Sequence, residues 1–396
     1  MKSIFRGLSI ILILGLLLAG CGGEATPSLP APEIPASSQK SCGDDVCDGP
    51  ENAQTCPEDC LVEGDEAVAV DLAPEINPNT PPLYFFYVIH AHGSGEFLPY
   101  ADPGQTSIDS EKADNMLAAI EGIAAILDQH GVKASWQFLP ATVKGFRQYQ
   151  GAENIITQLQ ANGHEIGVHA HKLEDVQDSY ENIQEYIGIT PETSSGFIAQ
   201  LSKVSPSDSK NAMSFAIEVP AKLGLSVGTV NLSPGGEKNT LSAECHDIFG
   251  IGNDMWAETG NLMFPWRPDY LHKDPCSHNP KGEMLFIDHV SIDWIILTEG
   301  GGASDLLDAR HFERLSDQFD GALDYMAENQ PDRVAVWGFI THIIEYAVGG
   351  KGENPPSANS LQALDDFLSY VQTKQQEGLV IYATPKEIST IIEVSE

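Results

Sequence analysis

The stretch ENIITQLQANGHEIGVHAH, residues 153–171, joins a helix pattern directly to a strand pattern. Its first half repeats apolar residues at helical spacing and stops at Gly163, a residue type that commonly ends helices. Its second half, HEIGVHAH, has the apolar and β-branched content of a buried strand. A helix followed at once by a strand is the alternation from which parallel α/β folds are built.

The chain repeats this alternation from Leu83 onward. Further strand patterns are LYFFYVIHAH, KASWQFL, LSVGTVNL, EMLFIDHVS, RVAVWGFITH and GLVIYAT. Helical periodicity covers residues 109–130, 305–329 and 358–376. Alternation on this scale predicts an α/β fold, and the length suits a barrel. Residues 233–281 have no clear periodicity, so we expect a long loop insertion there.

The amino terminus, MKSIFRGLSIILILGLLLAGC, has the pattern of a secretory signal. Its apolar run, residues 8–19, is shorter than the roughly 20 residues of a membrane-spanning helix. Leu18-Ala19-Gly20-Cys21 resembles the bacterial lipobox, which predicts a signal peptide over 1–20 and a lipidated Cys21. An ordinary signal peptide is the alternative. Both readings place the mature protein outside the cytoplasm, and lipidation would anchor it to a membrane.

Six further cysteines suit an oxidising compartment and predict three disulfides. They are Cys42, Cys47, Cys56, Cys60, Cys245 and Cys276. The simplest pairing places two bridges among the first four, in an order that the sequence does not give, and a third between Cys245 and Cys276. Residues 42–60 then form a Cys-rich module between a tether at 21–41 and a linker at 61–82, with the barrel at 83–396. The acidic side chains of this module are candidate Ca²⁺ ligands, and a solvated acidic face is the alternative.

The net charge is strongly negative, −36 for the whole chain. Removal of residues 1–20 takes away two of the 21 Lys and Arg and none of the 57 Asp and Glu, which leaves −38. Such a surface favours solubility and argues against nucleic acid or anionic lipid as a partner. The charge does not identify a substrate.

Two of the strand patterns end in His-x-His pairs, His90 with His92 and His169 with His171. Residues i and i+2 of a strand project from the same face, and the sites of parallel barrels lie at the carboxyl ends of the strands. Four imidazoles at that end predict a transition-metal site, with zinc as the default for nitrogen ligands. Ordinary hydrogen-bonded lining of the barrel is the alternative.

GVKASWQFLP, residues 131–140, followed by QLQANGHEIGVHAH resembles the polysaccharide deacetylase (NodB-homology) family, whose GHEIG strand carries metal-binding histidines. The resemblance spans about residues 83–393. It implies a distorted (β/α) barrel of seven strands and a closing strand and helix at GLVIYATPKEI. It also implies metal-dependent removal of N-acetyl groups from a polysaccharide.

Three later motifs follow in the family's order. WRPDY resembles the motif in which an arginine, here Arg267, orients the catalytic base, and Trp266 is a candidate substrate contact. Asp293-Trp294 resembles the next motif, in which the aspartate supports that arginine and the tryptophan shields the substrate. WGFITH resembles the last motif, whose histidine, here His342, protonates the departing amine.

The metal-binding motif departs from the family pattern. The family has H-x-x-x-H, but Leu173 lies four residues after His169, so the second ligand on this strand would be His171. Aligning Gly93 with the glycine of the first motif puts His92 in place of the metal-binding aspartate. The expected ligands are therefore His92, His169 and His171, with His90 beside them.

The same alignment puts Ala91 where the family has its catalytic base, and an alanine abstracts no proton. Candidates to replace that base are Asp288, Glu96 and His90, and the sequence does not choose among them. The missing base favours an alternative function, a carbohydrate- or metal-binding surface lipoprotein without hydrolysis. A glycosidase-type barrel hydrolase is a third reading, and it needs two carboxylates that flank the scissile bond.

Overall fold

The computed structural model describes ten stretches of the chain, all within one compact unit that runs from Asp71 to Glu396. The described residues are 81–92, 110–150, 154–170, 173–195, 217–230, 263–269, 274–292, 295–296, 307–347 and 354–395. The predicted signal peptide, tether and Cys-rich module lie outside them. Within the described part, no helix combines the length and apolar character needed to cross a membrane.

Helices and strands alternate along the unit, as the sequence pattern predicted. The strands are β1 (Leu83–Ala91), β2 (Ser135–Phe138), β3 (Glu165–His169), β4 (Thr193–Ser195), β5 (Val227–Val230), β8 (Leu285–Asp288), β9 (Val290–Ser291), β10 (Val336–His342) and β11 (Val380–Tyr382). The helices are α2 (Ser110–Gln129), α3 (Pro140–Gln150), α4 (Ile155–Ala161), α5 (Leu173–Asn182), α11 (Ala309–Asn329), α12 (Ala358–Gln376) and α13 (Pro385–Ser395). The described part also contains a π-helical turn (Ile183–Ile187) and a 3-10 turn (Ile343–Tyr346), and residues 217–222 and 295–296 are helical.

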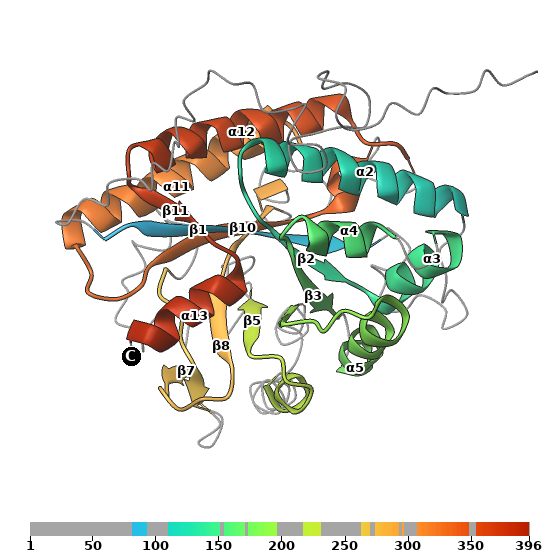
Figure 1. Ribbon diagram of the computed structural model, residues 1–396. Coiled ribbons are helices and arrows are strands. Elements are labelled where there is room, and N and C mark those ends of the chain that lie inside the picture. The colour runs from blue at the N-terminus through green and yellow to red at the C-terminus, as the bar shows by residue number, and fades with distance from the viewer. Residues whose placement is uncertain are drawn as a thin grey trace, which may run out of the picture. The chain divides into compact units, whose positions relative to one another are not determined.

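One parallel sheet organises the unit. Its strands lie in the order β8-β5-β4-β3-β2-β1-β10-β9, and β11 pairs with the first residues of β1. β8 ends at Asp288 and β9 begins at Val290, so one short segment pairs with β5 at one edge and with β10 at the other. The sheet is therefore a nearly closed, distorted barrel. Figure 1 shows α2, α11 and α12 together above β1 and β10.

The path has eight strands where the resemblance implied seven. Residues 283–291 were predicted as one strand, but they form two, because His289 separates the part that pairs with β5 from the part that pairs with β10. The three-residue β4 was not predicted. The expected loop insertion over 233–281 contains a small antiparallel pair, β6 (Pro268–Asp269) and β7 (Asp274–His278).

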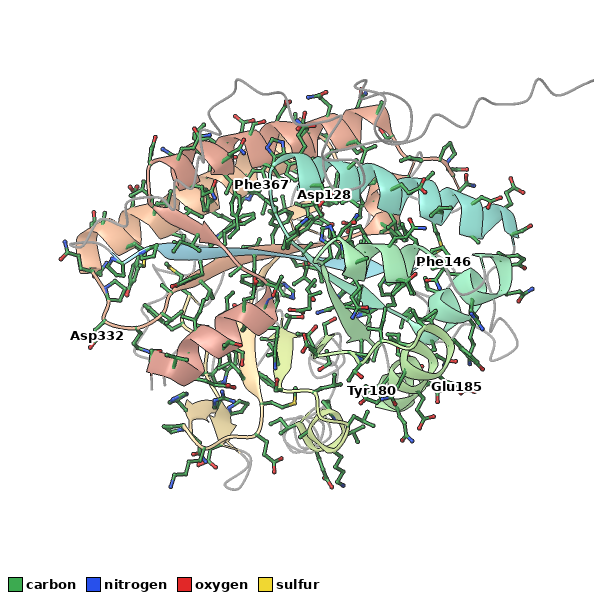
Figure 2. All side chains as sticks on the ribbon, in the orientation of Figure 1. Asp128, Phe146, Tyr180, Glu185, Asp332 and Phe367 are labelled. Atoms are coloured by element: carbon green, nitrogen blue, oxygen red, sulfur yellow. The ribbon has the colours of Figure 1, made fainter. Side chains whose placement is uncertain are left out.

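The two faces of the strands pack differently. Alternate residues such as Phe85 and Tyr87 face outward and pack against the helices in one large apolar cluster. Residues of the other parity face the barrel interior, where Phe86, Val88 and Ile340 form a second cluster. Among the side chains labelled in Figure 2, Phe367 belongs to the buried outer cluster, whereas Glu185 and Asp332 are exposed.

The amino end of the barrel is held by a buried carboxylate. Glu165, the first residue of β3, accepts hydrogen bonds from the Ser135 and Thr193 hydroxyls at 2.6 Å and from the backbone N–H of Lys386 at 2.8 Å. Burial raises the pKa of Glu165, and these donors oppose the rise. Lys386 is the second residue of α13, so Glu165 ties the last helix to the barrel end opposite the carboxyl ends of the strands.

Candidate metal and catalytic centre

Strand register brings the histidines predicted from sequence to one end of the barrel. His90 on β1 and His342 on β10 are register partners at the carboxyl ends of their strands, and His169 is the last residue of β3. All three side chains are nearly buried, and His92, which follows β1, is fully buried. The carboxyl end of a parallel barrel is where enzymes of this architecture place their sites.

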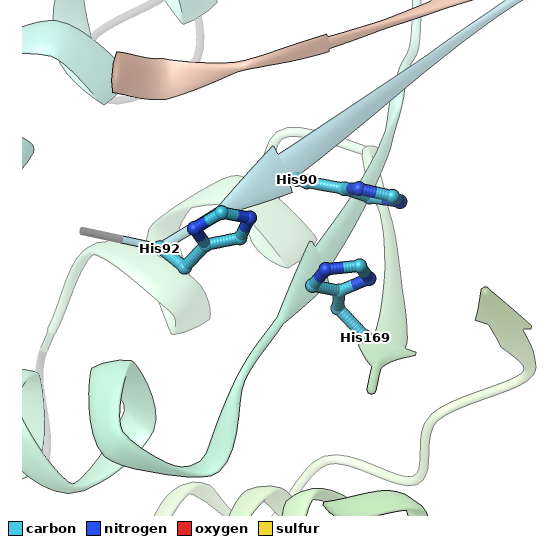
Figure 3. A group of neighbouring side chains, drawn as sticks. All are labelled: His90, His92 and His169. Carbon is cyan, nitrogen blue, oxygen red and sulfur yellow. The ribbon is translucent and has the colours of Figure 1, made fainter. Parts of the chain in front are cut away.

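His90, His92 and His169 form a compact imidazole cluster, the His triad (Figure 3). One ring nitrogen of each lies within 4.8 Å of the corresponding atoms of the other two. The His90 and His169 rings stack with centroids 3.6 Å apart, and the His92 and His169 rings with centroids 5.1 Å apart. Three converging nitrogen donors in a buried setting fit a divalent transition metal, and this ligand type suits zinc.

Ser195, the last residue of β4, joins two members of the His triad. Its hydroxyl lies 2.6 Å from His90 Nε2 and 3.2 Å from His169 Nδ1, and the residue is only 2% exposed. Ser195 is the register partner of His169, which explains why both side chains project to the same side of the sheet. Sequence reasoning missed this residue.

His342 is held by a buried carboxylate, Glu345. The Glu345 side chain accepts the backbone N–H of His342 at 2.8 Å through Oε2, and its Oε1 lies 3.1 Å from His342 Nδ1. Glu345 is fully buried. On its other side, His342 Nε2 lies 3.2 Å from His90 Nδ1. A carboxylate at Nδ1 orients the imidazole and can stabilise the positive charge that a histidine carries during proton transfer.

The buried hydroxyls near Glu345 are neutral. Tyr87 Oη lies 2.5 Å from Thr341 Oγ1 and 2.8 Å from Tyr346 Oη. Burial raises the pKa of both tyrosines, and the charge of Glu345 raises each further. Tyr87 and Tyr346 are therefore neutral neighbours of Glu345.

A further histidine, His289, lies between β8 and β9. Leu285 and Ile287 of β8 belong to the interior cluster, so alternation directs His289 into the barrel as well. Burial, with help from the nearby His342, lowers its pKa to about 3. His289 is therefore a neutral polar side chain near His342. The sequence motifs pointed to its neighbour Asp288 instead.

Three other predicted site residues have described positions. Arg267 pairs with Glu393 of α13 at 3.2 Å and donates to the Gly282 carbonyl at 3.4 Å. Trp266 is 1% exposed and packs edge-to-face against Phe286. Asp288 is fully buried at the end of β8. The catalytic roles of Arg267 and Asp288, and the substrate contact of Trp266, stay predictions.

Several predicted residues lie outside the described part of the chain. They are Cys21, Cys42, Cys47, Cys56, Cys60, Glu96, His171, Cys245, Asp293 and Trp294. Cys276 lies on β7, but only its backbone is described. The lipid anchor, the disulfides, the Ca²⁺ ligands and the fourth histidine of the two His-x-His pairs therefore stay predictions.

Comparison with protein-family models and with curated proteins gives no match. Solved structures do show similarity. A Mycobacterium smegmatis protein that carries the name polysaccharide deacetylase has 13% identity and a TM-score of 0.48, over 80% of this chain and 92% of its own. A Pseudomonas aeruginosa PAO1 protein with the same name has 14% identity and a TM-score of 0.48, over 78% and 90%.

An allantoinase (PuuE) gives 13% identity and a TM-score of 0.48, over 78% of this chain and 89% of its own. The chain therefore has a low-identity structural similarity to polysaccharide deacetylases and also to a differently named enzyme. At these identities and TM-scores the similarity carries no information on activity.

Proposed function

We propose that this protein is a metal-dependent hydrolase that removes N-acetyl groups from a glycan. The observation that carries the proposal is the His triad of His90, His92 and His169, buried at the carboxyl end of the barrel with His342 and Glu345 beside it. A set of nitrogen ligands next to a carboxylate-supported histidine is the arrangement that metal-assisted hydrolysis needs.

The His triad would hold the ion. When bound, such an ion lowers the pKa of a coordinated water and polarises a carbonyl group. The His triad suits such an ion because its three donors are nitrogen atoms that all lie within 4.8 Å of one another. His171 stays a candidate further ligand from the sequence pattern.

His342 and Glu345 supply the proton transfer. Water adds to the amide carbon, and its proton passes to the imidazole pair His90–His342, whose facing nitrogens are 3.2 Å apart. This pair replaces the base that the family resemblance expects at Ala91. Glu345 stabilises the resulting positive charge through His342 Nδ1. The carbon–nitrogen bond then breaks, and the proton goes to the departing amine, which leaves acetate and a free amino group.

The substrate class comes from the sequence resemblance. The motifs GHEIG, WRPDY and WGFITH occur in the order of a family that acts on N-acetylated polysaccharides. The amino-terminal pattern would place the protein outside the cytoplasm on a lipid anchor at Cys21, where such glycans are present. The anchor is tested by measuring how wild type and Cys21→Ser partition between the membrane and soluble fractions. We expect wild type in the membrane fraction and the variant in the soluble fraction.

An N-acetylated chitooligosaccharide tests the activity. We expect wild type supplied with Zn²⁺ to release acetate, His342→Ala to lose that release, and the control His130→Gln, in the turn after α2, to keep it. Cleavage between the sugars without acetate would overturn the deacetylase assignment in favour of a glycosidase.

A second candidate function is glycan binding without hydrolysis, and Ala91 is the feature that favours it. In that case the oligosaccharide binds to wild type, as measured by calorimetry, and neither acetate nor shorter sugars appear. That result would contradict the hydrolase and leave a binding protein on the same barrel.

A further inference from the structure

A continuous chain of hydrogen bonds crosses the site from His169 to Glu345. His169 Nδ1 lies 3.2 Å from Ser195 Oγ, and Ser195 Oγ lies 2.6 Å from His90 Nε2. His90 Nδ1 lies 3.2 Å from His342 Nε2, and His342 Nδ1 lies 3.1 Å from Glu345 Oε1. The members come from β3, β4, β1, β10 and the 3-10 turn after β10, so only the closed fold assembles them.

Glu345 sets the direction of the first link. An ionised carboxylate has no hydrogen to donate, and this one already accepts the backbone N–H of His342. His342 Nδ1 must therefore carry the hydrogen in its bond to Glu345. A neutral imidazole has a single N–H, so His342 Nε2 is left as an acceptor.

The same rule assigns donor and acceptor in each following hydrogen bond. His342 Nε2 accepts, so His90 donates from Nδ1 and its Nε2 becomes an acceptor. Ser195 has one hydroxyl hydrogen and gives it to His90 Nε2. The Ser195 oxygen then accepts from His169 Nδ1–H, which leaves the lone pair of His169 on Nε2. These hydrogen positions are assigned from the network.

We propose that Glu345 and Ser195 are positioning residues that hold His342, His90 and His169 in the Nδ1–H tautomer, so that His169 offers Nε2 to a metal. The assignment of a metal to His169 rests on the proposed function, whereas the tautomers are a property of the metal-free protein. Partners on the second ring nitrogen commonly fix the tautomer of metal-binding histidines. A serine shared by two imidazoles does so for both at once.

The hydrogen-bond chain also determines the role of each His90 nitrogen. Both of its nitrogens take part, Nδ1 toward His342 and Nε2 toward Ser195. His90 can therefore enter a metal's coordination through Nε2 only by giving up the Ser195 hydrogen, whereas His169 keeps its Ser195 bond while its Nε2 binds. His90 is thus the member of the His triad that also contacts His342, and its binding to a metal through Nε2 would replace the Ser195 hydrogen bond.

Imidazole nitrogen NMR tests the proposal directly. The full-length protein, labelled with ¹⁵N-histidine, is stripped of metal with a chelator and kept at about pH 8, where ordinary histidines are neutral. Long-range ¹H–¹⁵N spectra distinguish the two tautomers, and single histidine variants assign the signals. We expect His90, His169 and His342 of the wild type to be Nδ1–H, the opposite of the form that histidine prefers in water.

Ser195→Ala removes the hydroxyl that connects His90 to His169 in the hydrogen-bond chain. We expect His169 to change to the Nε2–H form in this variant, while His342 stays Nδ1–H because Glu345 is intact. The matched control is Ser194→Ala, which removes the neighbouring buried serine of β4 and should change neither histidine. A wild-type His169 in the Nε2–H form, or a His169 unchanged by Ser195→Ala, would overturn the proposal.

The same samples separate this inference from the proposed function. If the three histidines are in the Nδ1–H form but the protein binds no Zn²⁺, the hydrogen-bond chain is supported and the proposed metal centre is contradicted. If Zn²⁺ binds and His169 coordinates it through Nδ1, the metal centre is supported and the proposed hydrogen-bond chain is contradicted.

Discussion

His90 and His342 are register partners on adjacent parallel strands although 252 positions separate them in the chain. Their facing nitrogens lie 3.2 Å apart at the carboxyl end of the barrel. The buried Glu345 side chain contacts His342, and the Ser195 hydroxyl contacts both His90 and His169. The pairing of β1 with β10 therefore connects a carboxylate-supported histidine to the candidate metal ligands.

The first prediction concerns Glu345. Glu345→Gln keeps the size of the side chain but removes the charge that stabilises protonated His342, so we expect kcat for acetate release to fall about 100-fold. KM should change little, because the buried side chain does not reach the substrate. The matched control is Glu387→Gln, which alters a carboxylate that accepts a backbone N–H at the start of α13. Equal kcat in the two variants would contradict the role of Glu345.

The second prediction concerns pH and His164. Burial, with help from the charge of Lys133, lowers the pKa of His164 to about 4. The unfolded chain binds a proton near pH 6.5, so the contribution of neutral His164 to stability is present above that pH and is lost as pH falls toward 4. Between pH 7 and pH 5 the loss should be about 2 kcal/mol in the free energy of unfolding.

His164→Asn isolates this contribution. The asparagine carbonyl can still accept the Ala134 N–H, which His164 Nδ1 accepts at 3.1 Å, but it does not titrate. Urea unfolding of the metal-free protein at pH 7 and pH 5 should therefore show a smaller loss for the variant. Identical losses for variant and wild type would show that His164 does not titrate as described.

The third prediction concerns Glu165 and the last helix. In Glu165→Gln the amide oxygen can replace the acceptor for Ser135 and Thr193, but an NH₂ group then faces the Lys386 N–H. An unsatisfied buried donor costs on the order of 1–3 kcal/mol. Hydrogen exchange of the α13 amides should become faster. Ser226→Ala removes only the contact to Lys386 Nζ and should leave α13 protected, and equal exchange in both variants would disprove the link.

The fourth prediction concerns Gly167 in the GHEIG motif. A Cβ at this position would meet Gln137 Cγ at 2.9 Å and the Thr193 carbonyl oxygen at 3.1 Å, and it would overlap the Thr193 hydroxyl. We expect Gly167→Ala to lower the free energy of unfolding by about 1–3 kcal/mol. In the control Gly122→Ala, on α2, the new Cβ meets the tip of the Leu361 side chain, which can move. Thermal unfolding of the two variants should differ clearly, and similar midpoints would refute the crowding at Gly167.

The strands that carry the histidines were predictable because their apolar content is strong. LYFFYVIHAH, HEIGVHAH and RVAVWGFITH correspond to β1, β3 and β10, and helix 358–376 was predicted to the residue. The i, i+2 rule and the position of sites at the carboxyl ends of barrel strands predicted His90, His92, His169 and His171 as a group. The structure brings the first three together, and His171 lies outside the described residues.

Ser195, Glu345 and His289 could not be found in this way. Ser195 lies on a three-residue strand, Thr-Ser-Ser, that has no apolar signal, and only its pairing with β3 and β5 makes it a strand. Glu345 faces His342 because the chain enters a 3-10 turn directly after β10, and an extended strand would have pointed it elsewhere. His289 enters the barrel because the predicted single strand divides in two at that residue. Each depends on tertiary pairing that a local pattern does not contain.

Metal content of the purified full-length protein tests the central claim most directly. Elemental analysis should find about one transition-metal ion per chain in wild type and in the control His278→Asn on β7, and none in His92→Ala or His169→Ala. A wild type that binds no metal from a Zn²⁺-containing buffer, or a His169→Ala variant that keeps its metal, would contradict the metal centre.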